Sequence, residues 1–196
     1  MSTREGIPLL HVGVSAWIIQ DGNYRDFKLG QKAKFALEFY PVQDLHALEH
    51  GPAVANHITA SNYRIRARVV FRGPQAWVID AGPFMAFQQR EPPKSAAAGA
   101  WVEGAIYLGI DPFFYFEQLY RLDGMPPLSY QWVVREILRE TTPWLETKDQ
   151  FGRTLNERDE SRESFVPAAK TDAWHDDAGH GHYVMACEQT QGPERP

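Results

Sequence analysis

Apolar and polar residues alternate with a period of two over much of the first 120 residues. Between residues 32 and 40 the apolar face consists of Ala33, Phe35, Leu37 and Phe39. In the segment 63–71 it consists of Tyr63, Ile65, Ala67, Val69 and Phe71. A period of two with one apolar face predicts half-buried antiparallel strands.

Four further stretches predict strands, at residues 12–19, 76–80, 84–88 and 101–110. Turn-forming runs such as Ala81-Gly82-Pro83 separate them. Isolated glycines at Gly30 and Gly104 mark bends or bulges. This punctuation favours a mainly β fold built on a small antiparallel β-barrel of the oligonucleotide/oligosaccharide-binding (OB) type. A β-sandwich would leave the same pattern and stays open as the alternative.

The spacing changes after Pro126-Pro127. Trp132, Val133, Ile137 and Leu138 share one helical stripe, Ser129 suits an N-cap and Pro143 ends the run, so we expect one C-terminal helix. Residues 146–163 hold six acidic and four basic side chains and few apolar ones, which predicts solvated chain. The expected segments are a barrel domain at 1–125, a packing helix at 126–145, an acidic flexible linker at 146–172, a short hairpin packing on the barrel at 173–190 and a disordered tail at 191–196.

Composition narrows the class of protein. The chain has 196 residues, 43% of them hydrophobic and 23% charged, which is ordinary for a globular protein. Its single cysteine, Cys187, excludes an internal disulfide and a cysteine-only zinc site. Neither a secretory signal nor an apolar run of about 20 residues is evident. We therefore expect a cytoplasmic protein without a membrane partner.

Charge is divided unevenly along the chain. Residues 1–100 carry 11 Lys and Arg against 8 Asp and Glu, and residues 101–196 carry 9 against 17. A net charge of -5 argues against a general nucleic-acid coat protein, which would be basic. It permits a local basic face together with an acidic C-terminal extension.

One row of arginines has the spacing of a polyanion site. On the outward face of the strand predicted at 63–71, and just beyond it, lie Arg64, Arg66, Arg68 and Arg72. Side chains on one strand face repeat about every 7 Å, close to the spacing of single-strand phosphates. The row is therefore a candidate site for single-stranded nucleic acid, and the competing interpretation is a solvated strand face paired with acidic neighbours.

A second cluster offers metal ligands near the C-terminus. Its imidazoles and carboxylate, at His175, Asp177, His180 and His182, are ligands that zinc accepts. Their spacing matches no established metal motif, so we expect no cofactor. A divalent metal, and with it a metal-dependent enzyme, stays as the alternative.

Four consecutive aromatic residues form the third candidate, namely Phe113, Phe114, Tyr115 and Phe116. In a strand they could not all face one core, so two of them would meet the predicted helix or a partner protein.

Nucleophile-elbow, phosphate-loop and dinucleotide motifs are absent from the sequence. Carboxylates such as Glu38 with Asp80, or Glu103 with Asp111, would be acid–base partners only if the fold brought them together.

The ranking that follows favours a non-catalytic binding module, foremost a protein-interaction or accessory protein. It would use the aromatics of residues 113–120 and the acidic segment 146–163. Single-stranded nucleic acid or polyanion binding through the arginines is the first alternative. The metal-dependent enzyme is the second.

Overall fold

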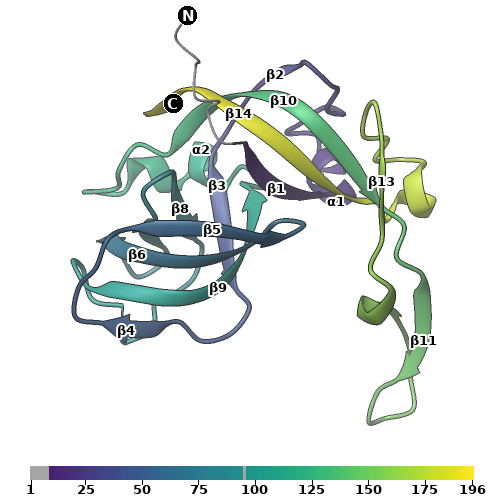
Figure 1. The fold of residues 1–196 in the computed structure, drawn as a ribbon, viewed down its shortest axis with the longest axis horizontal. Coiled ribbons are helices and arrows are strands. Elements are labelled where there is room, and N and C mark those ends of the chain that lie inside the picture. The colour runs from purple at the N-terminus through teal and green to yellow at the C-terminus, as the bar shows by residue number, and fades with distance from the viewer. Residues whose placement is uncertain (1–8, 95) are drawn as a thin grey trace, which may run out of the picture.

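A computed structural model describes residues 9–94 and 96–196 of the chain. The fold is mainly β, with a closed five-stranded barrel as its centre (Figure 1). The strands follow one another around the barrel in the order β9 (Trp101–Ile110), β3 (Leu37–Pro41), β8 (Met85–Gln88), β7 (Trp77–Asp80) and β6 (Asn62–Arg72). β6 then pairs back onto β9, with Asn62 opposite Tyr107 and Arg68 opposite Trp101. The predicted barrel is therefore confirmed over the β-sandwich alternative, although β3 and β8 pair in parallel and the prediction was an antiparallel barrel.

A second group of strands, here called the wing, continues from the barrel through β1. These strands are β1 (Leu10–Ser15), β14 (His182–Glu194), β10 (Ser129–Glu140), β2 (Lys32–Phe35) and β13 (Phe165–Pro167). β1 meets the barrel strand β9 at one parallel pair, Gly13 with Gly109. Figure 1 shows β10 and β14 running side by side as long curved strands above the barrel.

The remaining elements are short. β4 (His46–Leu48) pairs with β9, and β5 (Val54–Thr59) pairs with β6. β11 (Trp144–Lys148) and β12 (Thr154–Arg158) form a separate two-stranded sheet. The helical turns are α1 (Ala16–Gln20), α2 (Phe114–Glu117), η1 (Leu119–Arg121), η2 (Glu160–Arg162) and η3 (Asp176–Gly179).

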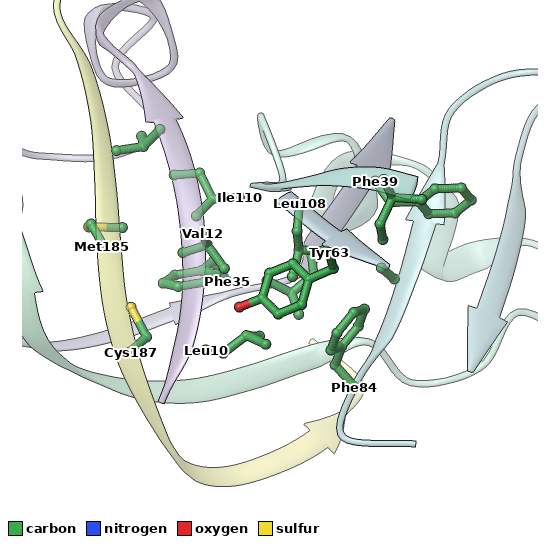
Figure 2. Packing of buried hydrophobic residues seen from close by; sticks show 14 of the residues in the cluster. Leu10, Val12, Phe35, Phe39, Tyr63, Phe84, Leu108, Ile110, Met185 and Cys187 are labelled. Atoms are coloured by element: carbon green, nitrogen blue, oxygen red, sulfur yellow. The ribbon is translucent and has the colours of Figure 1, made fainter. Parts of the chain in front are cut away.

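One apolar core joins the barrel to the wing. Leu10 and Val12 from β1 lie among Phe35, Leu108 and Met185, as Figure 2 shows. The predicted inward face of 63–71 is confirmed from Tyr63 to Val69, where every second residue is buried. For 32–40 the prediction holds in part: Phe35, Leu37 and Phe39 are buried and Ala33 is partly buried, but Ala36 and Glu38 of the predicted outward face are buried as well. Phe71 differs, because a bulge after Val69 shifts the register and turns its ring to a second, smaller cluster.

The predicted C-terminal helix is wrong, because residues 129–140 form strand β10. Tyr130, Trp132, Val134 and Ile137 all face the core. Bulges around Gln131 and between Val134 and Glu136 interrupt the alternation, so that the apolar spacing imitates a helical stripe. The aromatic and β-branched residues of this segment favour the strand.

Other segment predictions also need correction. The predicted strand 12–19 ends at Ser15, where α1 begins. The predicted linker 146–172 contains the β11–β12 hairpin and β13. In place of a hairpin at 173–190 the chain forms η3 and then one long strand, β14, which pairs with β1 and β10 at the same time. The predicted disordered tail is also ordered, because β14 reaches Glu194 and the Arg195 guanidinium donates to the carbonyls of Tyr120 and Met125.

Candidate functional site

The four consecutive aromatics lie in α2 and the residue before it. Tyr115 is fully buried, and its hydroxyl accepts from the Leu128 N–H at 3.0 Å and donates to the Pro126 carbonyl at 3.1 Å. Phe113, Phe114 and Phe116 are half-buried, and the Phe113 ring stacks on Phe116 with centroids 5.0 Å apart. Phe114, Tyr115 and Phe116 belong to the second core cluster. Most of this aromatic surface therefore faces the chain itself.

The arginine row does lie on the outer face of β6, but its members have neighbours. Arg66 forms an ion pair with Glu103 at 3.4 Å, and Arg72 donates to the Pro92 carbonyl at 3.4 Å. Arg68 stands opposite Asp80 on β7. Arg64 is exposed and lines a pocket of about 270 Å³ together with Asp44 and Glu103. The outer face is thus mixed in charge.

The four predicted metal ligands are engaged in separate contacts. His175 Nδ1 lies 2.7 Å from the Asp172 carboxylate, and Asp177 forms an ion pair with Arg158. His180 has its ring against Trp144, and His182 turns toward Glu140. Across residues 9–94 and 96–196 no three His, Cys, Asp or Glu side chains are grouped to hold a metal ion.

A pocket of about 340 Å³ lies where β1 and β9 diverge, and we call it the Tyr107 pocket. Its lining residues are Gly13, Ser15, Trp17, Ile18, Tyr40, Tyr107, Gly109, Ile110 and His182. Two glycines make room for the Tyr107 ring, because a Cβ on Gly13 would lie 1.8 Å from the Tyr107 hydroxyl and one on Gly109 would lie 3.2 Å from the ring. The sequence analysis missed this pocket, although it named His182 of the lining as a candidate metal ligand.

A hydrogen-bonded chain runs from the pocket into the wing. The Tyr107 hydroxyl lies 2.9 Å from His182 Nε2, and His182 Nδ1 lies 3.3 Å from a Glu140 carboxylate oxygen. Burial opposes ionisation of Glu140, but the hydrogen bonds from His182 and Thr142 and the nearby Arg158 charge outweigh it and lower its pKa. Glu140 is therefore ionised and can accept a hydrogen bond from His182 Nδ1.

Two carboxyl groups are buried beside the pocket. Glu38 is 3% exposed and stands opposite Gly109, and Asp111 is fully buried just past the end of β9. Burial raises the pKa of both groups, and for Asp111 it reaches about 8. Each has one oxygen without a hydrogen-bond partner in the described chain. The sequence analysis named both residues as acid–base candidates, but with Asp80 and Glu103 as their partners.

A hairpin outside the main sheet is the other prominent feature, and residues 144–158 are here called the arm. Figure 1 shows β11 extending away from the barrel. At the base of the arm the Arg158 guanidinium stacks on Trp144 at 3.9 Å, forms an ion pair with Asp177 and donates to the Thr142 carbonyl at 2.6 Å. At the tip the Asp149 carboxylate accepts from the Phe151 and Arg153 N–H groups at 2.8 and 2.9 Å.

Between its base and tip the arm exposes apolar side chains. Leu145 and Leu155 are each 40% exposed and lie on the same face of the hairpin, because Thr147, two residues from Leu145, pairs with Leu155. Phe151 at the tip is 74% exposed. β11 and β12 pair only with each other, so neither edge of the hairpin joins another strand of the described chain.

Comparison with known proteins adds no functional assignment. No family model matches the chain, and no curated protein or solved structure is significantly similar to it. In the residues described, no helix is both long and apolar enough to span a membrane.

Proposed function

We propose that the protein is a non-catalytic protein-interaction module that docks to its partner through the arm. The observation that carries the proposal is the exposure of Phe151, Leu145 and Leu155 on an ordered hairpin outside the core. An isolated two-stranded hairpin is at best marginally stable in water, and exposed contiguous apolar surface marks interaction sites. The arm is instead anchored by the buried end of Arg158 and braced at its tip by Asp149.

The charge of the arm indicates the chemistry of its partner. Residues 144–158 contain three acidic and three basic side chains, and the Arg153 and Arg158 charges are already paired with Asp149 and Asp177. Charge attraction therefore contributes little to docking. The fitting partner is a protein with an apolar groove that accepts the Phe151 ring and the leucine face, since aromatic anchors in pockets dominate interface energies.

The test compares capture of proteins by the wild-type chain and by Phe151→Asp, after nuclease treatment of a lysate of the source organism. Because Phe151 is 74% exposed, the substitution leaves stability within about 0.5 kcal/mol of wild type. We expect a dominant protein to be retained by the wild type and lost by Phe151→Asp. The matched control is Leu29→Asp, an exposed apolar residue elsewhere, which retains it. Equal capture by all three chains contradicts the proposal.

Two finer points belong to the same proposal. We assign the barrel to the OB type, an assignment supported by its five closed strands. We also assign the protein to the cytoplasm, supported by a lone buried thiol at Cys187, whose burial raises its pKa to about 12 and leaves it unreactive.

Binding of single-stranded nucleic acid through β6 is the second candidate function. It is favoured by the exposure of Arg64, Arg68 and Arg72, and the Arg66–Glu103 ion pair weighs against it. A salt titration tests it with labelled single-stranded DNA as the probe. If the arginines bind DNA, the affinity of the wild type falls steeply as the salt concentration rises, and the affinity of the double variant Arg64→Ala/Arg68→Ala falls less steeply. An affinity that does not change with salt contradicts this function.

A further inference from the structure

We propose that the Tyr107 pocket is an aromatic cage for a methylated ammonium cation, such as the head of choline or of a trimethylated lysine. Three electron-rich rings form its walls, from Trp17, Tyr40 and Tyr107. A cation over the face of an aromatic ring is attracted by the ring quadrupole, and cages of such rings suit quaternary ammonium ligands. The site is separate from the arm, and the inference does not depend on the function proposed above.

Two of the three rings lie close together. The centroids of Tyr40 and Tyr107 are 6.0 Å apart, and their planes meet at 55°. Trp17 on α1 is 51% exposed and Tyr40 is 41% exposed, so both rings are accessible from solvent. A volume of about 340 Å³ lies near the lower end of the range for small-molecule sites, about 300–1,000 Å³.

The Tyr107 hydroxyl can accept a hydrogen bond from the hydroxyl of choline in one tautomer of His182. In the tautomer that donates to Glu140, His182 Nε2 accepts the proton of Tyr107 at 2.9 Å. A free lone pair on the Tyr107 oxygen remains for the pocket, and the Ser15 hydroxyl lies in the same lining. No lysine, arginine, aspartate or glutamate lines the pocket, so an anionic ligand would find no ion-pairing partner there.

Two buried carboxyl groups behind the walls also favour a cation. Glu38 lies opposite Gly109 of the lining, and its carboxyl neighbours the Tyr40 hydroxyl. Neither Glu38 nor Asp111 forms an ion pair within residues 9–94 and 96–196, and each keeps an oxygen without a partner. A bound cation would stabilise the ionised form of these carboxyls, whereas a neutral ligand would not.

The experiment titrates the full chain with choline and with its neutral carbon isostere, 3,3-dimethylbutan-1-ol. We expect choline to bind roughly tenfold more tightly, which corresponds to about 1.4 kcal/mol, because the ring quadrupoles attract only the charged ligand. A parallel titration with N-acetyl-trimethyllysine amide distinguishes a small quaternary amine from a modified protein side chain. Either cation binding more tightly than the isostere supports the proposal, and the ratio of the two cations assigns the source.

Matched variants locate the binding. Trp17→Ala should weaken choline binding at least fivefold and Tyr40→Phe should leave it within about twofold, because phenylalanine keeps the ring. Trp174→Ala, at a 65%-exposed tryptophan outside the pocket, should leave it unchanged. Circular dichroism checks that each variant is folded, and Tyr40→Leu is the second variant if Trp17→Ala unfolds. Equal binding of the isostere, no saturable binding of either cation, or full binding by the folded Trp17→Ala or Tyr40→Leu chain overturns the proposal.

Discussion

At the scale of single residues, the burial of Asp111 makes the stability of the fold depend on pH. Its carboxyl is fully buried, and this burial, followed by the nearby Glu38 charge, raises its pKa to about 8 against the hydrogen bond from the Tyr115 N–H. Between about pH 4 and pH 8 the folded chain holds a proton that the unfolded chain has released. The free energy of unfolding therefore falls as pH rises through this range, by about 1.4 kcal/mol per pH unit, and levels off above it.

Asp111→Asn tests this dependence, because asparagine keeps an oxygen for the Tyr115 N–H and removes the titrating group. We expect urea unfolding of the wild type to show lower stability at about pH 8 than at about pH 5. The difference should be clearly smaller in Asp111→Asn. Parallel pH profiles for the two chains would show that Asp111 is ionised in the folded state.

Gly13 is a second residue whose role is steric. A methyl group there would meet the Tyr107 hydroxyl at 1.8 Å and the ring carbon that bears it at 2.5 Å. We expect Gly13→Ala to lower the free energy of unfolding by about 1–3 kcal/mol, the usual cost of overpacking. In a Tyr107→Ala background the same substitution should cost much less, and an unchanged cost in that double-mutant cycle would contradict the close packing.

The sequence carried a signal for the Tyr107 pocket at Tyr40. That residue occupies the outward face predicted for residues 32–40, where an exposed aromatic ring is unusual. Tyr107, His182 and Trp17 come from three other elements, and β1 meets β9 at only one pair. Their convergence depends on long-range pairing, which the local pattern of one strand does not encode.

At the scale of elements, Arg158 determines whether the arm is a defined structure. Its side chain stacks on Trp144, donates to the Thr142 carbonyl and lies against the Glu140 and Asp177 carboxylates. We expect Arg158→Met to speed amide hydrogen exchange throughout β11 and β12. Exchange in the barrel strands should remain unchanged, because the arm pairs with no other strand.

Arg153→Met serves as the control for that measurement. Arg153 contacts Asp149 at the tip, but its side chain is 73% exposed, so its ion pair is worth at most about 1 kcal/mol. We expect a local change near the turn only. If the amides of β11 and β12 exchange no faster in Arg158→Met than in Arg153→Met, the contacts of Arg158 at the base of the arm do not stabilise the hairpin.

β6 was predictable because it buries one face and keeps the period of two up to its bulge. β3 departs from that pattern, because Leu37, Glu38 and Phe39 are buried in succession. β10 was not predictable as a strand, because its bulges turn Val134 and Ile137, three residues apart, to the same side. The arm was missed for a different reason. Its strands have no buried face, so composition alone gives no periodic signal, and the hairpin depends on Arg158 contacts with residues outside it.

At the scale of the whole molecule, barrel and wing share one apolar core, whereas the arm adds nothing to it. Replacing residues 146–156 with a short Asn-Gly turn should therefore leave a single cooperative unfolding transition. We expect the free energy of unfolding, measured in urea, to stay within about 0.5 kcal/mol of the wild-type value. A large loss of stability would mean that the arm is part of the folding unit and not a separate docking element.

The most direct test of the interaction function is site-specific photo-crosslinking in cells of the source organism, with the photoreactive residue at position 151. The proposed function predicts one dominant protein adduct at position 151 and none at the control position 29, which is also exposed and apolar. The adduct should disappear when Leu145 and Leu155 are both changed to Asp. No adduct at 151, or the same adducts from both positions, would contradict docking through the arm.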